Sequence, residues 1–410
     1  MAGMMKHAIM LIGLLGGVAL AAGDMGGDVK SGELWKMPMQ QIKNNYLVGE
    51  NYNPVDNTTL RFRTNGHVTI GELSPNELVF NMSKEGDKLD SLQIVVYNKG
   101  DDGEVDKKEF EKILKETQTA LDTLTEVKGT KKAMSDRETG VKVKALVWEW
   151  DGGVAMLESC GSGKGRNFEA EFIRLAMAGD ADALKRGGAR DASSRSTLKK
   201  NVKHDENGDV WIDGIPMVDQ GQKGYCVPAT CARVFSYYGM DGVDQHAMAA
   251  LCDTNAGGGT TAPAMEAALK AISKKFHVKM EQLKEPSKPS FENFLAAYNK
   301  EARKAGKPEV KYSGGESDKL SFDDDLLAKA SGLKKGDFGK WLKPVRKAVD
   351  EGVPVMWIIP GHMRMIIGYN EKENTVIYSD SWGAAFAKRS MSVQEAIVRS
   401  EYRYVLKPTK

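Results

Sequence analysis

The sequence of 410 residues carries little net charge and has no long hydrophobic run after its first 22 residues. Lys and Arg number 58 against 56 for Asp and Glu, which leaves a net charge of +2. This near-balance gives no electrostatic reason to expect nucleic acid or an anionic membrane surface as a partner. A membrane-spanning helix needs about 20 consecutive apolar residues, and no later segment provides them.

His and Cys are scarce, at six and four residues, and none are grouped at the spacing of a zinc site. Residues 98–109 approach a calcium-binding EF-hand loop, but Asn98 and Gly100 stand where the loop needs its first acidic ligand and a further oxygen ligand. A strand is also predicted before this loop where an EF-hand has a helix. We therefore expect no metal and no cofactor, and interpret the segment as a strand-to-helix turn.

The first 22 residues have the pattern of a cleavable secretory signal. A short start that ends in Lys6-His7 is followed by the apolar run Ala8–Ala22, with small residues at Ala19 and Ala21 before the polar chain begins. The run is too short for a spanning helix. We expect a secreted or periplasmic bacterial protein with no membrane anchor after cleavage, and oligomeric state is left open.

The rest of the chain has the order of an α+β protein. Residues 24–178 are predicted to form a small α+β domain of unknown role. Residues 179–203 are polar and rich in Gly, Ser and charge, and we interpret them as a linker that is also a candidate processing site. Residues 204–410 form the second domain.

Periodicity and turn signals predict the elements of both domains. In the first domain we expect a hairpin of Leu60–Thr64 and His67–Leu73 across Asn65-Gly66, a strand at Leu92–Tyr97, a helix at Asp106–Val127 and a hairpin of Val141–Trp150 and Val154–Ser159. In the second we expect helices at Cys226–Tyr238, Met265–Lys275, Phe291–Ala305 and Gly339–Glu351, and strands at Val353–Ile359, Met363–Tyr369, Thr375–Ser379 and Arg403–Leu406.

Cys226 lies at the start of a predicted helix, after a turn that contains glycine. Free backbone N–H groups and the positive end of the helix dipole favour a thiolate at such a position. Gln220, six residues earlier, can place its amide beside the cysteine, where it and the Cys226 N–H would stabilise an oxyanion. We predict Cys226 as a nucleophile and Gln220 as an oxyanion donor. A buried core cysteine is the ordinary alternative.

A nucleophilic cysteine needs a base that a third group orients. His362 stands at the entrance of a predicted strand, and Asp380 follows the next strand. Adjacent antiparallel strands joined by the short turn at Glu371–Asn374 would bring these two side chains together. We therefore predict that Cys226, His362 and Asp380 form a catalytic triad. The presence of all three residues favours the interpretation of Cys226 as a nucleophile over its interpretation as a buried core residue.

These motifs resemble the papain-like cysteine peptidases, and CVPATCARVFSYYG with GGGTTAPAMEAALKAI most resembles the bacteriocin-processing, C-thirty-nine-like subgroup. The resemblance covers residues 209–406. It implies that Cys226 attacks, His362 transfers the proton, Asp380 orients the imidazole, Gln220 binds the oxyanion and Trp382 shields the His–Asp bond. Asp380 replaces the usual Asn, and Val227 replaces the Gly that commonly follows the cysteine.

The sequence thus predicts a cysteine peptidase that hydrolyses a peptide or protein substrate. Two alternatives stay open: an acyl transferase of transglutaminase type with the same triad, and a catalytically silent module that binds a peptide or cell-wall component. The remaining cysteines are Cys160, Cys231 and Cys252. Among them, Cys231 and Cys252 form the most plausible disulfide.

Overall fold

The computed structural model describes residues 23–48, 52–134, 140–163, 167–184, 194–221, 224–240, 242–255, 257, 259–273, 275–314 and 317–409. The predicted signal sequence 1–22 lies outside the described residues. The described chain mixes helices with mainly antiparallel sheets, which confirms the α+β class. No helix within it is long and apolar enough to cross a membrane.

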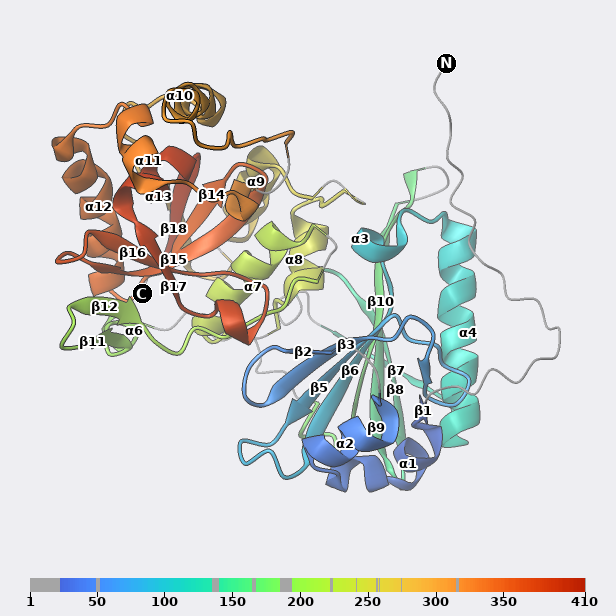
Figure 1. Cartoon of the computed structure of the whole chain (residues 1–410). Helices are drawn as coiled ribbons and strands as arrows, with labels where there is room; N and C mark the ends of the chain where they lie inside the picture. Colours follow the sequence, from blue (N-terminus) through green and yellow to red (C-terminus); the bar gives the residue numbers. More distant parts are fainter. Residues whose placement is uncertain are drawn as a thin grey trace, which may run out of the picture.

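Residues 23–184, here called the N-terminal part, are built on an eight-stranded antiparallel sheet with strand order β2-β3-β5-β6-β10-β9-β8-β7. Figure 1 shows helix α4 lying along this sheet and the short N-terminal helices at its lower end. The elements are β1 (Gly23–Asp24), α1 (Gly26–Ser31), η1 (Glu33–Lys36), α2 (Met39–Tyr46), β2 (Tyr52–Pro54), β3 (Thr59–Arg63), β4 (Val68–Thr69), β5 (Glu77–Met82), β6 (Leu89–Asn98), α3 (Lys99–Asp102), α4 (Lys107–Thr125), β7 (Thr130–Lys132), β8 (Lys144–Trp150), β9 (Gly153–Ser162) and β10 (Glu169–Ala178).

Local sequence signals explain several of these elements. The Asp106 side chain accepts a hydrogen bond from the Glu109 backbone N–H and so caps α4, as the spacing of the two residues predicts. β8 and β9 form the expected antiparallel pair, with Trp150 opposite Gly153. The segment after β6 continues as the one-turn helix α3, which agrees with a strand-to-helix turn.

The hairpin predicted across Asn65-Gly66 is wrong in its pairing. Both residues have positive φ, 47° and 80°, so the tight turn itself forms. However, β3 pairs with β2 and β5, whereas β4 pairs with β1 in a separate two-stranded parallel sheet. The turn residues determine only that the chain reverses direction at this point. Which strands pair with β3 and β4 is determined by the other strands of the sheets.

Residues 194–409, here called the C-terminal part, have a second antiparallel sheet with order β11-β12-β15-β14-β18-β13. In addition to this order, β16 pairs with β15, and β17 pairs with β16. All nine residues of β15 are buried, and two helices, α7 and α12, contact this strand. The elements are α6 (Arg195–Lys199), β11 (Val202–His204), β12 (Asp209–Ile212), α7 (Cys226–Tyr237), α8 (Gln245–Leu251), α9 (Ala262–Ser273), β13 (Val278–Gln282), α10 (Phe291–Lys304), η3 (Ser317–Lys319), α11 (Asp324–Ala330), α12 (Lys335–Asp350), β14 (Val355–Ile359), β15 (His362–Asn370), β16 (Thr375–Ser379), η4 (Ala384–Phe386), β17 (Arg389–Ser392), α13 (Val393–Arg399) and β18 (Tyr402–Pro408).

The predicted linker 179–203 extends too far. Its last residues form α6 and β11, and β11 pairs with β12 at the edge of the C-terminal sheet. Leu198 of α6 is 1% exposed and belongs to the apolar core of the C-terminal part. The segment is polar in composition, and Leu198 alone does not change that composition. A prediction from composition therefore assigns the whole segment to a linker.

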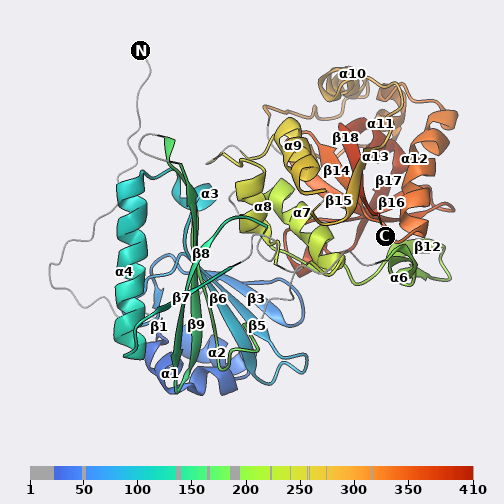
Figure 2. The same ribbon diagram turned by 180° about the vertical axis from the view of Figure 1, so that it is seen from behind.

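The two parts have separate apolar cores and meet at the helices that open the C-terminal part. Both views place α7 and α8 on the side that faces the N-terminal sheet (Figure 2), and α8 contacts β10. Arg174 of β10 bonds Asp244, the residue that caps α8. A cavity of about 300 Å³ also lies between the parts. The helix that carries Cys226 is therefore next to the interface.

We expect Leu198→Ala to destabilise the C-terminal part by about 2–5 kcal/mol, the usual result of emptying a buried leucine site. Chemical denaturation measures this free energy of unfolding. Val48→Ala is the control, because Val48 is 70% exposed. If both variants unfold like the unsubstituted protein, residues 194–203 do not anchor this core.

Candidate active site

Cys226 is the first residue of α7, a helix whose following residues are nearly all buried. Tyr225 precedes it with non-helical backbone angles, and the first helical hydrogen bond runs from Ala229 N to Tyr225 O at 2.8 Å. Cys226 itself is partly exposed. The sequence pattern of an apolar helix opened by a turn thus leaves one thiol accessible at the helix start.

All four cysteines are free. The predicted disulfide between Cys231 and Cys252 is therefore wrong for this structure, although both residues lie in the same helical region and are completely buried. The Cys231 sulfur has the Met356 sulfur as a neighbour at 4.0 Å. These thiols fill the core, and burial raises the pKa of both.

His362 begins β15 directly after a tight turn at Pro360-Gly361. Gly361 has a φ of +74°, a conformation that side chains rarely adopt, and β14 and β15 pair with Ile359 opposite His362. The turn therefore fixes the imidazole at the end of a rigid, fully buried strand. His362 is 3% exposed.

Asp380 follows β16, which pairs antiparallel with β15 and ends beside the start of that strand. The His362 Nε2 atom lies 2.7 Å from Asp380 Oδ1, and the same oxygen accepts the Ser381 backbone N–H at 2.8 Å. The other oxygen, Oδ2, lies 3.0 Å from Arg364 Nε. The carboxylate is 1% exposed and is surrounded by partners.

The protonation of this pair follows from its partners. Burial alone would lower the pKa of His362, but the hydrogen bond to Asp380, together with the nearby Cys226 thiol, raises it to about 10. Burial would raise the pKa of Asp380, but His362 and Arg364 hold it below its usual value. A protonated imidazole beside an ionised carboxylate is therefore the stable state at neutral pH.

Cys226 is among the groups that raise the pKa of His362. Asp380 occupies Nε2, so Nδ1 is the ring nitrogen that remains. Nδ1 is buried and makes no fully aligned hydrogen bond among the described residues. Such contacts often tighten only when a substrate is bound.

Gln220 is joined to the same group through Ser381. Its backbone N donates to Ser381 O at 2.9 Å, and its side-chain Oε1 accepts from Ser381 Oγ at 2.7 Å. This second bond occupies Oε1 of the amide, and among the described residues no acceptor is recorded for Nε2. Gln220 is 2% exposed.

The Trp382 ring stacks on the His362 ring, with centroids 6.0 Å apart and planes inclined by 22°. It is partly exposed. The structure thus brings His362, Asp380 and Trp382 into direct contact, and Gln220 is linked to them through Ser381.

Three residues in this group had no place in the sequence prediction. Arg364 forms an ion pair with Asp380, and the Ser381 backbone N–H donates a hydrogen bond to it. Arg233 of α7 donates to Ser379 Oγ at 2.6 Å and to Pro216 O at 2.9 Å. Arg364 carried a usable signal, because it lies two residues after His362 and so shares its face of the strand. Arg233 and Ser381 had no such local signal.

The described residues contain no group of three or more His, Cys, Asp or Glu side chains that could hold a metal ion.

Residues 311–407 match the model of the Peptidase_C39 like family. The match supports a C39-like domain of the papain-like peptidases in the C-terminal region, and so confirms the resemblance predicted from sequence. The matched region contains His362 and Asp380 but not Gln220 or Cys226. No curated protein and no solved structure matched the chain.

We expect Asp380→Asn to lower the pKa of His362, because the carboxylate charge and hydrogen bond that raise it are lost or weakened. NMR titration of the imidazole measures this shift. Because the pKa of His362 is raised by folding, its contribution to stability is complete below about pH 6.5, the unfolded value, and is lost as the pH rises toward about 10. The variant would lack this decline.

Asp90→Asn is the matched control, because Asp90 is exposed on β6. An unchanged imidazole pKa in the Asp380 variant would contradict the assigned contact.

Proposed function

We propose that the chain is a cysteine peptidase that hydrolyses a peptide bond in a peptide or protein substrate. Cys226 is the nucleophile, His362 the proton donor and acceptor, Asp380 the group that orients the imidazole, and Gln220 the oxyanion donor. The observation that supports this most directly is the bond from His362 Nε2 to Asp380, which leaves Nδ1 for the Cys226 thiol. The family match supports the class of activity.

Acylation follows from this arrangement. The sulfur of Cys226 attacks the substrate carbonyl carbon, and the C=O electron pair moves to the oxygen. Gln220 Nε2 and the Cys226 backbone N–H donate to that oxygen, where the negative charge develops. His362 then gives its proton to the amide nitrogen, the C–N bond breaks, and an amine leaves.

Deacylation uses the same groups in reverse order. The now neutral His362 accepts a proton from water while the water oxygen attacks the thioester carbon. The C–S bond breaks, a carboxylic acid leaves, and the thiolate and imidazolium are restored. Throughout, the Asp380 carboxylate stabilises the imidazolium, and the charges of His362 and Arg364 keep its own pKa low, so that it does not take the proton.

We expect Cys226→Ala to abolish hydrolysis of a peptide library, with kcat reduced by at least about 10³-fold because the covalent route is lost. The variant should also lose covalent labelling by a peptidyl thiol-directed probe. Cys231→Ala is the matched control, because it removes a buried free thiol from the same helix. Mass spectrometry of products and labelled protein measures both effects.

The products distinguish the alternatives. Cross-linked amides in place of hydrolysed ones would assign the same triad to an acyl transferase. Measurable peptide binding with unchanged peptide after long incubation would indicate a silent binding module. Full hydrolysis by the Cys226 variant would remove the nucleophile assignment.

We also propose that the enzyme acts outside the cytoplasm, on the basis of the signal pattern in residues 1–22. We expect expression in a bacterial host to yield an exported chain that lacks about 22 N-terminal residues, the usual length of such a signal. Intact mass measurement of periplasmic and culture-medium fractions tests this. A full-length chain confined to the cytoplasm would contradict it.

A further inference from the structure

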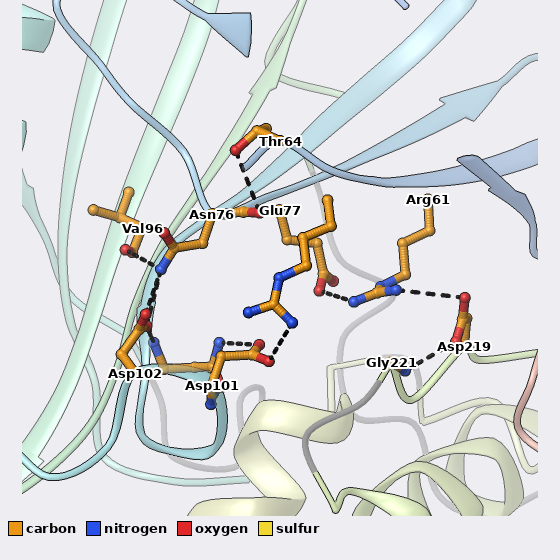
Figure 3. A network of polar contacts seen from close by, with 11 residues as sticks. Arg61, Thr64, Asn76, Glu77, Val96, Asp101, Asp102, Asp219 and Gly221 are labelled. Atoms are coloured by element: carbon orange, nitrogen blue, oxygen red, sulfur yellow. Dashed lines mark hydrogen bonds and ion pairs between the residues drawn. The ribbon is translucent and has the colours of Figure 1, made fainter. Parts of the chain in front are cut away.

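The segment that carries Gln220 is held at its start by the N-terminal part. Asp219, the preceding residue, is 3% exposed, and its Oδ2 lies 3.2 Å from Asn53 Nδ2 and 3.6 Å from Arg61 Nη1. Its other oxygen accepts the Gly221 backbone N–H at 2.9 Å. One aspartate thus connects strands β2 and β3 with the backbone next to Gln220. Figure 3 shows its contacts with Arg61 and Gly221.

Arg61 also packs directly on this backbone. Gly221 has a φ of +65°, and the Arg61 guanidinium occupies the space that a Cβ at this position would need. Glycine is therefore required both for the turn and for the close approach of the arginine. The contact leaves little freedom for the segment to move toward β3.

Arg61 is fixed within its own sheet. Its Nη2 lies 2.5 Å from Glu77 Oε2 on the neighbouring strand β5, and Arg61 and Glu77 are 7% and 2% exposed. The hydrogen-bonded ion pair with Glu77 orients the guanidinium, and Asp219 at 3.6 Å adds a second, longer ion pair. The position of Asp219 therefore depends, through Arg61, on the position of the N-terminal sheet.

The other end of the segment also rests on the N-terminal part. Tyr225, immediately before Cys226, is 2% exposed, and its ring lies 2.5 Å from where a Cβ on Gly100 would stand. The Gly100 backbone also hydrogen-bonds the Tyr225 hydroxyl. Gly100 is part of α3, which is held to the sheet by Asp101–Arg63 at 3.3 Å and Asp102–Asn76 at 2.8 Å (Figure 3).

The interface is not continuously packed, because the cavity of about 300 Å³ between the parts is lined by Arg61, Asp219 and Arg174. Discrete polar links therefore determine where the segment lies. An oxyanion donor has to be within hydrogen-bond distance of the developing charge, and a displacement of about 1 Å can reduce the rate by about 10²-fold.

We propose that Arg61, held by Glu77, is a positioning residue of the active site, which acts through Asp219 to keep the Gln220 amide in place for the oxyanion. The N-terminal part is then required for turnover itself. This inference rests on the proposed function of Gln220.

A second arginine provides a matched comparison. Arg174 also lies on the N-terminal sheet, also bonds a buried glutamate of its own part, Glu158 at 2.7 Å, and also bonds an aspartate of the C-terminal part, Asp244. That aspartate caps α8 with its other oxygen and is not in the segment that carries Gln220. Arg61→Gln therefore removes a direct contact with Asp219, whereas Arg174→Gln acts on this segment only indirectly, through α8 and the bond from Gln245 Nε2 to Asp219 O at 3.3 Å.

We expect Arg61→Gln to lower kcat by about 10- to 100-fold, with KM changed less than about threefold, while Arg174→Gln keeps kcat within about twofold of the unsubstituted enzyme. Gln220→Ala sets the upper limit of the loss, about 10²- to 10³-fold. Asp219→Asn should lower kcat like the Arg61 variant, and the double variant should lose no more than either single one. Thermal unfolding of the two arginine variants reports whether they are equally folded.

The rate at which iodoacetamide alkylates Cys226 distinguishes a misplaced oxyanion donor from a general loss of structure, because a general loss of structure would change this rate. Displacement of iodide at an alkyl carbon forms no oxyanion, so Arg61→Gln should alkylate at the unsubstituted rate although it hydrolyses peptides slowly. Equal losses of kcat in both arginine variants, or an unchanged kcat in Arg61→Gln, would overturn the proposal.

Hydrogen exchange of residues 216–226 tests the same inference without activity. We expect faster exchange in Arg61→Gln than in Arg174→Gln, and equal exchange in the two variants would overturn the positioning role. If the unsubstituted chain neither hydrolyses peptides nor reacts with the peptidyl probe, the proposed function fails while this measurement still decides whether Arg61 holds the segment.

Discussion

The buried hydrogen bond between His362 and Asp380 is the interaction on which the candidate active site depends. An unpaired charge at this depth would be unfavourable by several kcal/mol, so the carboxylate is stable only with all its partners in place. One oxygen binds His362 and the Ser381 backbone, and the other faces Arg364. The carboxylate therefore stays ionised and fixes the ring, and the second ring nitrogen is the one available to the proposed nucleophile. Gln220 is bound to the same cluster through Ser381.

Much of this cluster follows from local sequence. Two apolar strands separated by a short turn predict an antiparallel pair, and residues at the start of one and just beyond the end of the other must then be neighbours. That argument places His362 beside Asp380, as the structure has them. Cys226 at a helix start follows from the turn and the apolar helix behind it. Short-range periodicity is sufficient here because each element is buried and regular.

Other features depend on contacts between distant segments, which no local pattern records. Asn65-Gly66 forms its turn, yet the partner of β3 is chosen by the sheet. Leu198 anchors a polar segment through one buried side chain. The bond between Arg61 and Asp219 joins β3 to a loop far along the chain. Burial of polar groups and strand choice are tertiary properties, so a single sequence predicts them poorly.

The two classes of contact have different consequences for chemistry. His362 and Asp380 belong to neighbouring strands of the C-terminal sheet, and the proposed nucleophile Cys226 lies on α7 of the same part. Gln220, the proposed oxyanion donor, lies between Ser381 on one side and Asp219 on the other, and Asp219 forms an ion pair with Arg61. An oxyanion donor acts mainly in the transition state, whereas substrate affinity depends on other contacts. A link between the parts at this position therefore acts on the rate of the bond-breaking step more than on binding.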